Sequence, residues 1–157
     1  MFQLIRKISK PLFIIYLVLL ILVIVLKYPT TLVVSTVQAW RRGEAVCRMA
    51  PQLVPFRTTI FYVKHVQAVN DWFFKNLACN LIMFMPYGFL LPMFAKKNKR
   101  LRVILSGCIV SVMIEIFQYI TALGQCDIDD VILNTAGVAI GYFIYYLIYK
   151  KEWHQAE

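Results

Sequence analysis

Apolar residues run along this chain in four long windows in which charged side chains are almost absent. The windows cover about residues 12–28, 77–95, 103–123 and 131–149. A helix needs about 20 predominantly apolar residues to cross a hydrocarbon core of about 30 Å, and each window approaches this length. The hydrophobic pattern therefore predicts four transmembrane helices.

Composition extends this prediction to the whole chain. The 157 residues are 61% hydrophobic, with a mean hydropathy of +0.67, and the windows leave no room for a separate soluble domain. We expect one membrane domain over residues 1–157. Its predicted fold is an all-α integral membrane protein, a compact bundle of about four transmembrane helices with an outer interfacial helix or loop.

The positions of the basic residues predict the orientation. The net charge is +9, and the lysines and arginines lie at the window ends and in one long loop. The short loop "KKNKR" at 96–100 is basic, whereas "GQCDIDD" at 124–130 has no basic residue. The positive-inside rule places the first loop and both termini in the cytoplasm, and the second loop outside. The 29–75 loop then also lies outside, although it carries basic residues, because long loops count less in this rule.

This charge distribution also bears on partners. The basic residues form no groove-like stripe, so we expect no nucleic-acid partner. The lipid bilayer is the expected partner of this multi-pass membrane protein.

Part of the long outer loop has helical spacing of its own. Apolar residues between Arg57 and Asp71 recur at about one helical turn, and the aromatic run Trp72, Phe73 and Phe74 follows. Such a pattern predicts a short helix on the outer membrane interface that leads into the second span. An irregular loop with scattered aromatic residues is the alternative.

Polar residues inside the windows occur in pairs that share a helix face. The pairs are Asn76 with Asn80, Glu115 with Gln118, and Asp130 with Asn134. Spacings of three and four residues place each pair on one face. Because successive spans alternate in direction, all three pairs belong to the outer side of the bundle. We therefore expect a polar pocket that opens outward.

Small residues extend two of these polar helix faces. Gly107 and Ser111 precede Glu115 at helical spacing, and Gly137 and Gly141 form a small-xxx-small pair beyond Asn134. Such residues let helix backbones approach closely. The glycine pair predicts tight packing within the bundle and is also a candidate interface for a homo-oligomer.

Glu115 is the most informative of the polar residues. An ionised carboxylate at this depth costs several kcal/mol unless it is paired, hydrogen-bonded or wet. Protonation, a cation such as Arg57, or water in the pocket would each remove this cost. Alternatively, Glu115 joins helices through amide neighbours such as Asn80 and Asn134.

Three aspartates stand directly before the fourth window. Asp127, Asp129 and Asp130 are placed to cap a helix N-terminus and to meet its positive dipole end. Three acids exceed what a cap requires, and our functional hypothesis rests on Asp130 first and Asp127 second. Their spacing is not that of a calcium loop, so we expect no metal and no other cofactor. Whether Cys47 pairs with Cys126 stays open.

At several places the sequence resembles the VanZ family. The matching elements are "VPF" at 54–56, "NLIMFMPYGFLLP" at 80–92, Glu115 with Gln118, and "LGQCDIDDVILNTAGVAIG" at 123–141. Their order and spacing agree over about residues 50–142, although Gln52 stands where the family usually has Asn. The resemblance implies a small bacterial membrane protein associated with low-level resistance to teicoplanin and related lipoglycopeptides, largely sparing vancomycin. The family's polar positions carry over to Asn80, Glu115, Gln118, Asp127, Asp130 and Asn134.

These observations leave two classes of function and a structural alternative. In the leading hypothesis, an outer pocket binds an amphiphile, such as a lipoglycopeptide, or a lipid-linked wall component. Its candidate ligand-binding residues are Arg57, Asn76, Asn80, Glu115, Gln118, Asp127, Asp129, Asp130 and Asn134. In the second, a membrane enzyme modifies a lipid-linked envelope substrate, with Glu115 and Asp130 as acid and base. A structural or assembly role through Gly137 and Gly141 is the third.

Overall fold

The computed structural model describes the chain in several segments. The backbone is described for residues 2–26, 30–44, 46, 49–64, 72–95 and 100–153. Side chains are described within these segments except at residues 2–6, 62, 72–76 and 150–153.

The described residues form helices joined by irregular segments, and they contain no strand. In chain order the helices are α1 (Phe2–Leu26), α2 (Thr30–Arg41), α3 (Arg57–Lys64), α4 (Trp72–Phe94), α5 (Arg100–Thr121) and α6 (Ile128–Trp153). Four of them are long and apolar enough to cross a membrane, over Lys7–Leu26, Leu77–Phe94, Arg100–Thr121 and Ile128–Tyr149. The predicted all-α fold with four membrane-spanning helices is confirmed.

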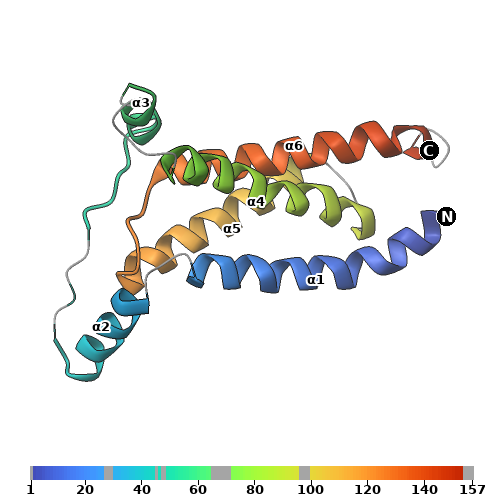
Figure 1. Ribbon diagram of the computed structural model, residues 1–157. Helices are drawn as coiled ribbons and strands as arrows, with labels where there is room; N and C mark the ends of the chain where they lie inside the picture. The colour runs from blue at the N-terminus through green and yellow to red at the C-terminus, as the bar shows by residue number, and fades with distance from the viewer. Residues whose placement is uncertain are drawn as a thin grey trace.

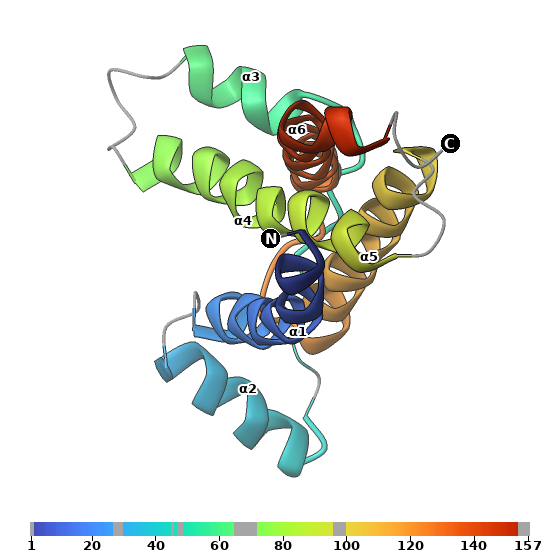
Figure 2. The ribbon, with the colours of Figure 1, turned by 90° about the vertical axis from the view of Figure 1, so that its right-hand side faces the viewer.

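The four long helices lie side by side, and both termini are at one end of the bundle (Figure 1). An even number of spans accounts for this, and the predicted cytoplasmic location of that end remains a prediction. Helices α2 and α3 lie at the opposite end (Figure 1), and α3 runs crosswise to the long helices (Figure 2). The part of the predicted interfacial helix at 57–64 therefore exists, while residues 65–71 lie outside the described residues.

Helix α2 was not predicted. Its sequence, TTLVVSTVQAWR, is rich in Thr and Val, whose branched side chains lower helix propensity. It lies within the predicted 29–75 loop, which in fact contains this helix as well as α3. The boundary at the fourth span also differs, because α6 begins at Ile128, ahead of the window predicted from 131.

The closest packing in the bundle is between α4 and α6. A Cβ atom added at Gly137 would overlap the carbonyl oxygen of Leu81, and one at Gly141 would overlap that of Met85. These overlaps confirm the close backbone approach predicted from the two glycines. A homo-oligomer through Gly137 and Gly141 would need this surface to be free, and within the chain α4 covers it.

The outer surface of the bundle is apolar and its interior holds polar side chains, which is the reverse of a soluble protein. Large apolar side chains such as Leu19 on α1, Ile116 on α5 and Phe143 on α6 are exposed, whereas Ser111 and Asn134 are buried. Exposed apolar side chains match a hydrocarbon solvent, and interior polar groups then satisfy one another. The ends of the bundle are therefore where polar ligands can enter.

Candidate functional site

The inner face of α5 carries the first elements of the candidate site. Its buried residues are Val103, Gly107, Ser111, Glu115, Gln118 and Thr121. Spacings of three and four residues place them on one stripe of a helix with 3.6 residues per turn. Glu115 and Gln118 therefore face the bundle interior together, as their spacing predicted.

Glu115 meets the start of α6. Its side chain is 3% exposed, and Oε2 accepts a hydrogen bond from the backbone amide of Asp127 at 3.0 Å. The connection between α5 and α6 thus turns back, so that α6 begins at the level of Glu115. A backbone amide partly satisfies the buried carboxylate, an arrangement that the sequence alone did not indicate.

Asp127 has two roles, one for each carboxylate oxygen. Oδ1 accepts the backbone amide of Asp129 at 2.9 Å, which makes Asp127 the N-cap of α6. Oδ2 accepts the hydroxyl of Thr58 at 2.6 Å, a residue of α3 far away in the sequence. The capping role proposed as the alternative for these aspartates is therefore real for Asp127.

Asp129 is the most buried carboxylate of the site, with 2% of its side chain exposed. Oδ1 accepts the backbone amide of Phe56 at 2.5 Å. Oδ2 accepts the amide of Thr59 at 2.8 Å and its hydroxyl at 3.0 Å. Asp129 thus caps the N-terminus of α3 from another part of the chain, where the helix dipole favours a negative charge.

The backbone adds a second connection between the same two segments. Gln52 pairs with Asp127 in a parallel bridge, in which the Gln52 amide donates to Cys126 O at 2.8 Å and the Ile128 amide donates to Gln52 O at 3.0 Å. The side-chain amide of Gln125 donates to Ala50 O at 2.9 Å. Residues 50–59 are therefore attached to the start of α6 along their length.

We call the contacts of Asp127 and Asp129 with Phe56, Thr58 and Thr59 the carboxylate latch. Within the described part of the chain, neither aspartate lies within ion-pair distance of a lysine or arginine, and the ion pair found there joins Arg42 to Glu44. The latch therefore relies on amides, hydroxyls and a helix N-terminus. Thr58 and Thr59 were not among the predicted site residues, although two hydroxyls directly after "VPFR" were a usable signal, because buried acids need donors.

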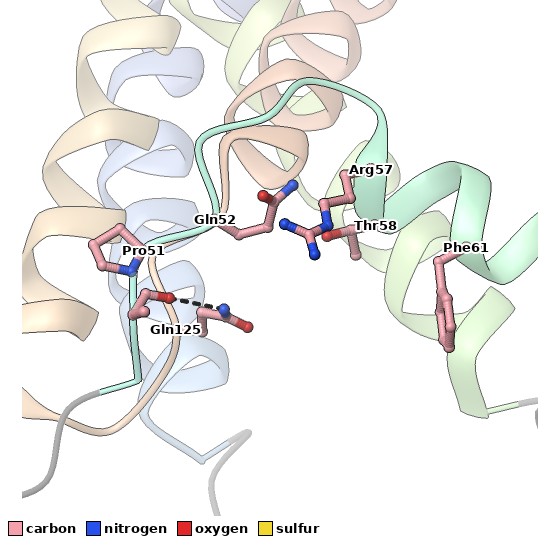
Figure 3. Close-up of a pocket in the computed structure, with 7 residues that line it drawn as sticks. Pro51, Gln52, Arg57, Thr58, Phe61 and Gln125 are labelled. Atoms are coloured by element: carbon pink, nitrogen blue, oxygen red, sulfur yellow. Dashed lines mark hydrogen bonds between the residues drawn. The ribbon is translucent and has the colours of Figure 1, made fainter.

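A pocket of about 350 Å³ lies on the outer surface of the latch (Figure 3). The residues that line it are Ala50, Pro51, Gln52, Arg57, Thr58, Phe61 and Gln125. The Arg57 guanidinium turns toward Gln52, and Phe61 stands beyond Thr58 (Figure 3). Of the described residues that line this pocket, none is acidic. Among the predicted ligand-binding residues whose side chains the structure describes, Arg57 lies at its wall.

The remaining predicted residues lie deeper or beside the latch. Asn134 is 4% exposed, and its side-chain amide donates to Ser111 Oγ at 2.8 Å. Asn80 is also buried, and its Nδ2, like Oδ1 of Asn134, has no hydrogen-bond partner among the described residues. Asp130 is half-buried, and the side chain of Asn76 lies outside the described residues.

Cys126 lies near the acids of this site. Burial raises the pKa of the Cys126 thiol, and the nearby carboxylates of Glu115 and Asp127 raise this pKa further. Cys126 forms no disulfide with a described residue, and Cys47 lies outside them. Within the described segments, no three His, Cys, Asp or Glu side chains are grouped as metal ligands would be.

Comparisons with known proteins agree with the resemblance seen in the sequence. The family model described as VanZ/LLP1 matches residues 13–149. Protein VanZ of Enterococcus faecium is 38% identical over 77 residues, which make up 49% of this chain and 48% of that protein. The match thus spans about half the length of this relative. No solved structure matches the chain. Because the family model covers most of the sequence, the chain belongs to the VanZ/LLP1 family.

Proposed function

We propose that this protein of the cell envelope binds an amphiphile or a lipid-linked wall component in the pocket beside the carboxylate latch. Through this binding it gives low-level resistance to teicoplanin and related lipoglycopeptides in the bacterial membrane. The relative from Enterococcus faecium, named Protein VanZ, supports the resistance phenotype. Because the match spans about half of that protein, the phenotype is a proposal for this chain.

The observation that carries the proposal is the composition of the pocket wall. Arg57 supplies a cation, Gln52 and Gln125 supply amides, and Phe61 supplies an aromatic surface. Helix α3 carries Arg57, Thr58 and Phe61 of the pocket wall. This helix lies at the bundle end opposite the termini, which is the outer end in the predicted orientation. A site with polar and apolar groups at a membrane interface suits a ligand with a polar head and an acyl chain.

The enzyme hypothesis finds less support in the geometry. Glu115 is buried and accepts the Asp127 amide, and neither Glu115 nor Asp130 is among the residues of the pocket wall. An acid and a base would have to reach a reacting group, and the pocket presents a cation and amides in their place. We therefore propose a binding protein.

The test is resistance in a susceptible Gram-positive host that expresses the chain. The inhibitory concentrations of teicoplanin and vancomycin are measured for the unchanged chain, for Arg57→Gln and for Lys64→Gln at matched membrane levels. Lys64 is exposed on α3 and is not among the residues that line the pocket, so it controls for loss of charge. We expect a rise selective for teicoplanin that Arg57→Gln removes and Lys64→Gln keeps. No rise with the unchanged chain would refute the proposed phenotype.

A further inference from the structure

The rim of the pocket combines one unpaired cation with an exposed apolar surface. The structure gives Arg57 no ion-pair partner among the described residues, and its side chain is exposed. On the same segment, exposed apolar side chains are Leu53, Val54, Phe56, Ile60, Phe61 and Val63. This is a large apolar surface for so short a stretch of chain.

The amides and the hydroxyl of the pocket wall already have hydrogen-bond partners, so Arg57 is the main free donor. The Gln52 side chain folds onto its own segment, with Nε2 donating to Val54 O at 2.6 Å and Oε1 accepting the Val54 amide at 3.2 Å. Thr58 gives its hydroxyl proton to Asp127. The guanidinium of Arg57 retains planar donors that match the oxygens of a phosphate or carboxylate.

Asp127 and Asp129 lie behind the pocket wall, but they do not cancel the preference of Arg57 for an anionic group. Asp129 is held by the N-terminus of α3, whose partial positive charge offsets the carboxylate. Asp127 is covered on the pocket side by the Thr58 hydroxyl. Since Arg57 is the first residue of α3, the Asp129 cap also fixes the start of the helix that carries Arg57. Asp129 is in this sense a positioning residue for the cation.

From these features we propose that the pocket holds the oxyanion headgroup of an outer-leaflet lipid. Arg57 binds the headgroup, and the acyl chain lies against Phe61 and the neighbouring apolar surface of α3. This inference rests on the proposed function and narrows it, because it names the chemical class of the amphiphile. The apolar surface favours a lipid over a free anion, because an acyl chain would cover this surface and a free anion would not.

The test measures lipid binding by the purified full-length chain in a neutral detergent. Native mass spectrometry counts bound dioleoyl phosphatidate and, separately, dioleoyl phosphatidylcholine for the unchanged chain, Arg57→Gln and Lys64→Gln. We expect phosphatidate to bind more tightly than phosphatidylcholine. Arg57→Gln should weaken phosphatidate binding by about tenfold or more, as loss of a charge-assisted hydrogen bond does, and Lys64→Gln should leave it unchanged. Circular dichroism verifies that each variant keeps its helices.

Competition by inorganic phosphate separates the two sources of an oxyanion. We expect millimolar phosphate to leave the bound phosphatidate in place. If inorganic phosphate displaced the bound phosphatidate, the pocket would be a site for a soluble anion. If Arg57→Gln and Lys64→Gln lost phosphatidate binding equally, the lipid would be responding to the general positive charge of the surface. Either result overturns the inference. Phosphatidate binding without any change in teicoplanin resistance would instead refute the proposed function and leave the lipid site standing.

Discussion

The carboxylate latch can be tested by replacing a single oxygen atom of Asp129 with nitrogen. Asp129 uses both carboxylate oxygens, Oδ1 for the Phe56 amide and Oδ2 for the amide and hydroxyl of Thr59. Asp129→Asn keeps the shape of the side chain but leaves one acceptor oxygen and adds an NH₂ group. At least one buried donor of residues 56–59 must then lose its partner.

The expected cost follows from those contacts. Leaving a buried donor unpaired costs about 1–3 kcal/mol, and the bonds that remain lose their charge assistance. We expect Asp129→Asn to destabilise the attachment of residues 52–61 by about 2 kcal/mol. This is about a 30-fold rise in the population in which the segment is detached, at about 1.4 kcal/mol for each factor of ten.

Hydrogen exchange read by mass spectrometry measures that population directly. In the full-length chain in detergent, peptides covering 52–61 should exchange much faster in Asp129→Asn, while peptides from α4 should exchange as before. The matched control is Glu44→Gln, the same chemical change at an exposed acid, which should leave exchange at 52–61 unchanged. If the Asp129 variant exchanged like the unchanged chain there, the latch would not be what holds the segment.

Three further predictions concern other parts of the structure. Gly141→Ala should lower the thermal unfolding temperature, with a loss of about 1–3 kcal/mol, because its Cβ would overlap the Met85 carbonyl oxygen; an unchanged temperature would refute the close α4–α6 approach. In a variant whose single cysteine is Cys126, the midpoint of the maleimide labelling rate against pH should lie above the value of about 8.5 for an ordinary thiol, because the raised pKa delays thiolate formation; a midpoint at or below about pH 8.5 would contradict this. Glu115→Gln removes one charge that raises this pKa, so it should speed labelling at a fixed pH, and an equal rate would show that the Glu115 charge is not felt there.

The sequence was sufficient for the membrane-spanning part of the fold. Long apolar windows identify helices that cross a bilayer because a single segment in hydrocarbon satisfies its own backbone hydrogen bonds as a helix. The pair Gly137 and Gly141 predicted a close helix contact, but the partner α4 could not be read from the chain. Helix α2 was not predicted because Thr and Val have weak helix propensity and the helix is short.

The site was predictable in its residue types and not in its pairings. Glu115 and the aspartates were expected at one level, and the structure joins Glu115 to Asp127. The donors Thr58 and Thr59 lie about 70 residues from the aspartates they satisfy. No periodicity reports contacts of that separation. The sequence favoured Asp130 first, because it shares a helix face with Asn134, and Asp127 second, whereas the latch residues are Asp127 and Asp129. Neighbouring helix residues point about 100° apart, so Asp129 and Asp130 face different sides.

The proposed function requires the pocket to face the outside of the cell, because a cytoplasmic pocket could not meet a lipoglycopeptide or an outer-leaflet lipid. The direct measurement is labelling of intact cells with a membrane-impermeant maleimide, using a chain whose native cysteines are replaced. One variant carries Gln125→Cys at the exposed pocket wall, and the other carries Asn98→Cys in the basic loop. We predict labelling of Gln125→Cys in intact cells and of Asn98→Cys after lysis alone; the reverse pattern would contradict an outward-facing pocket.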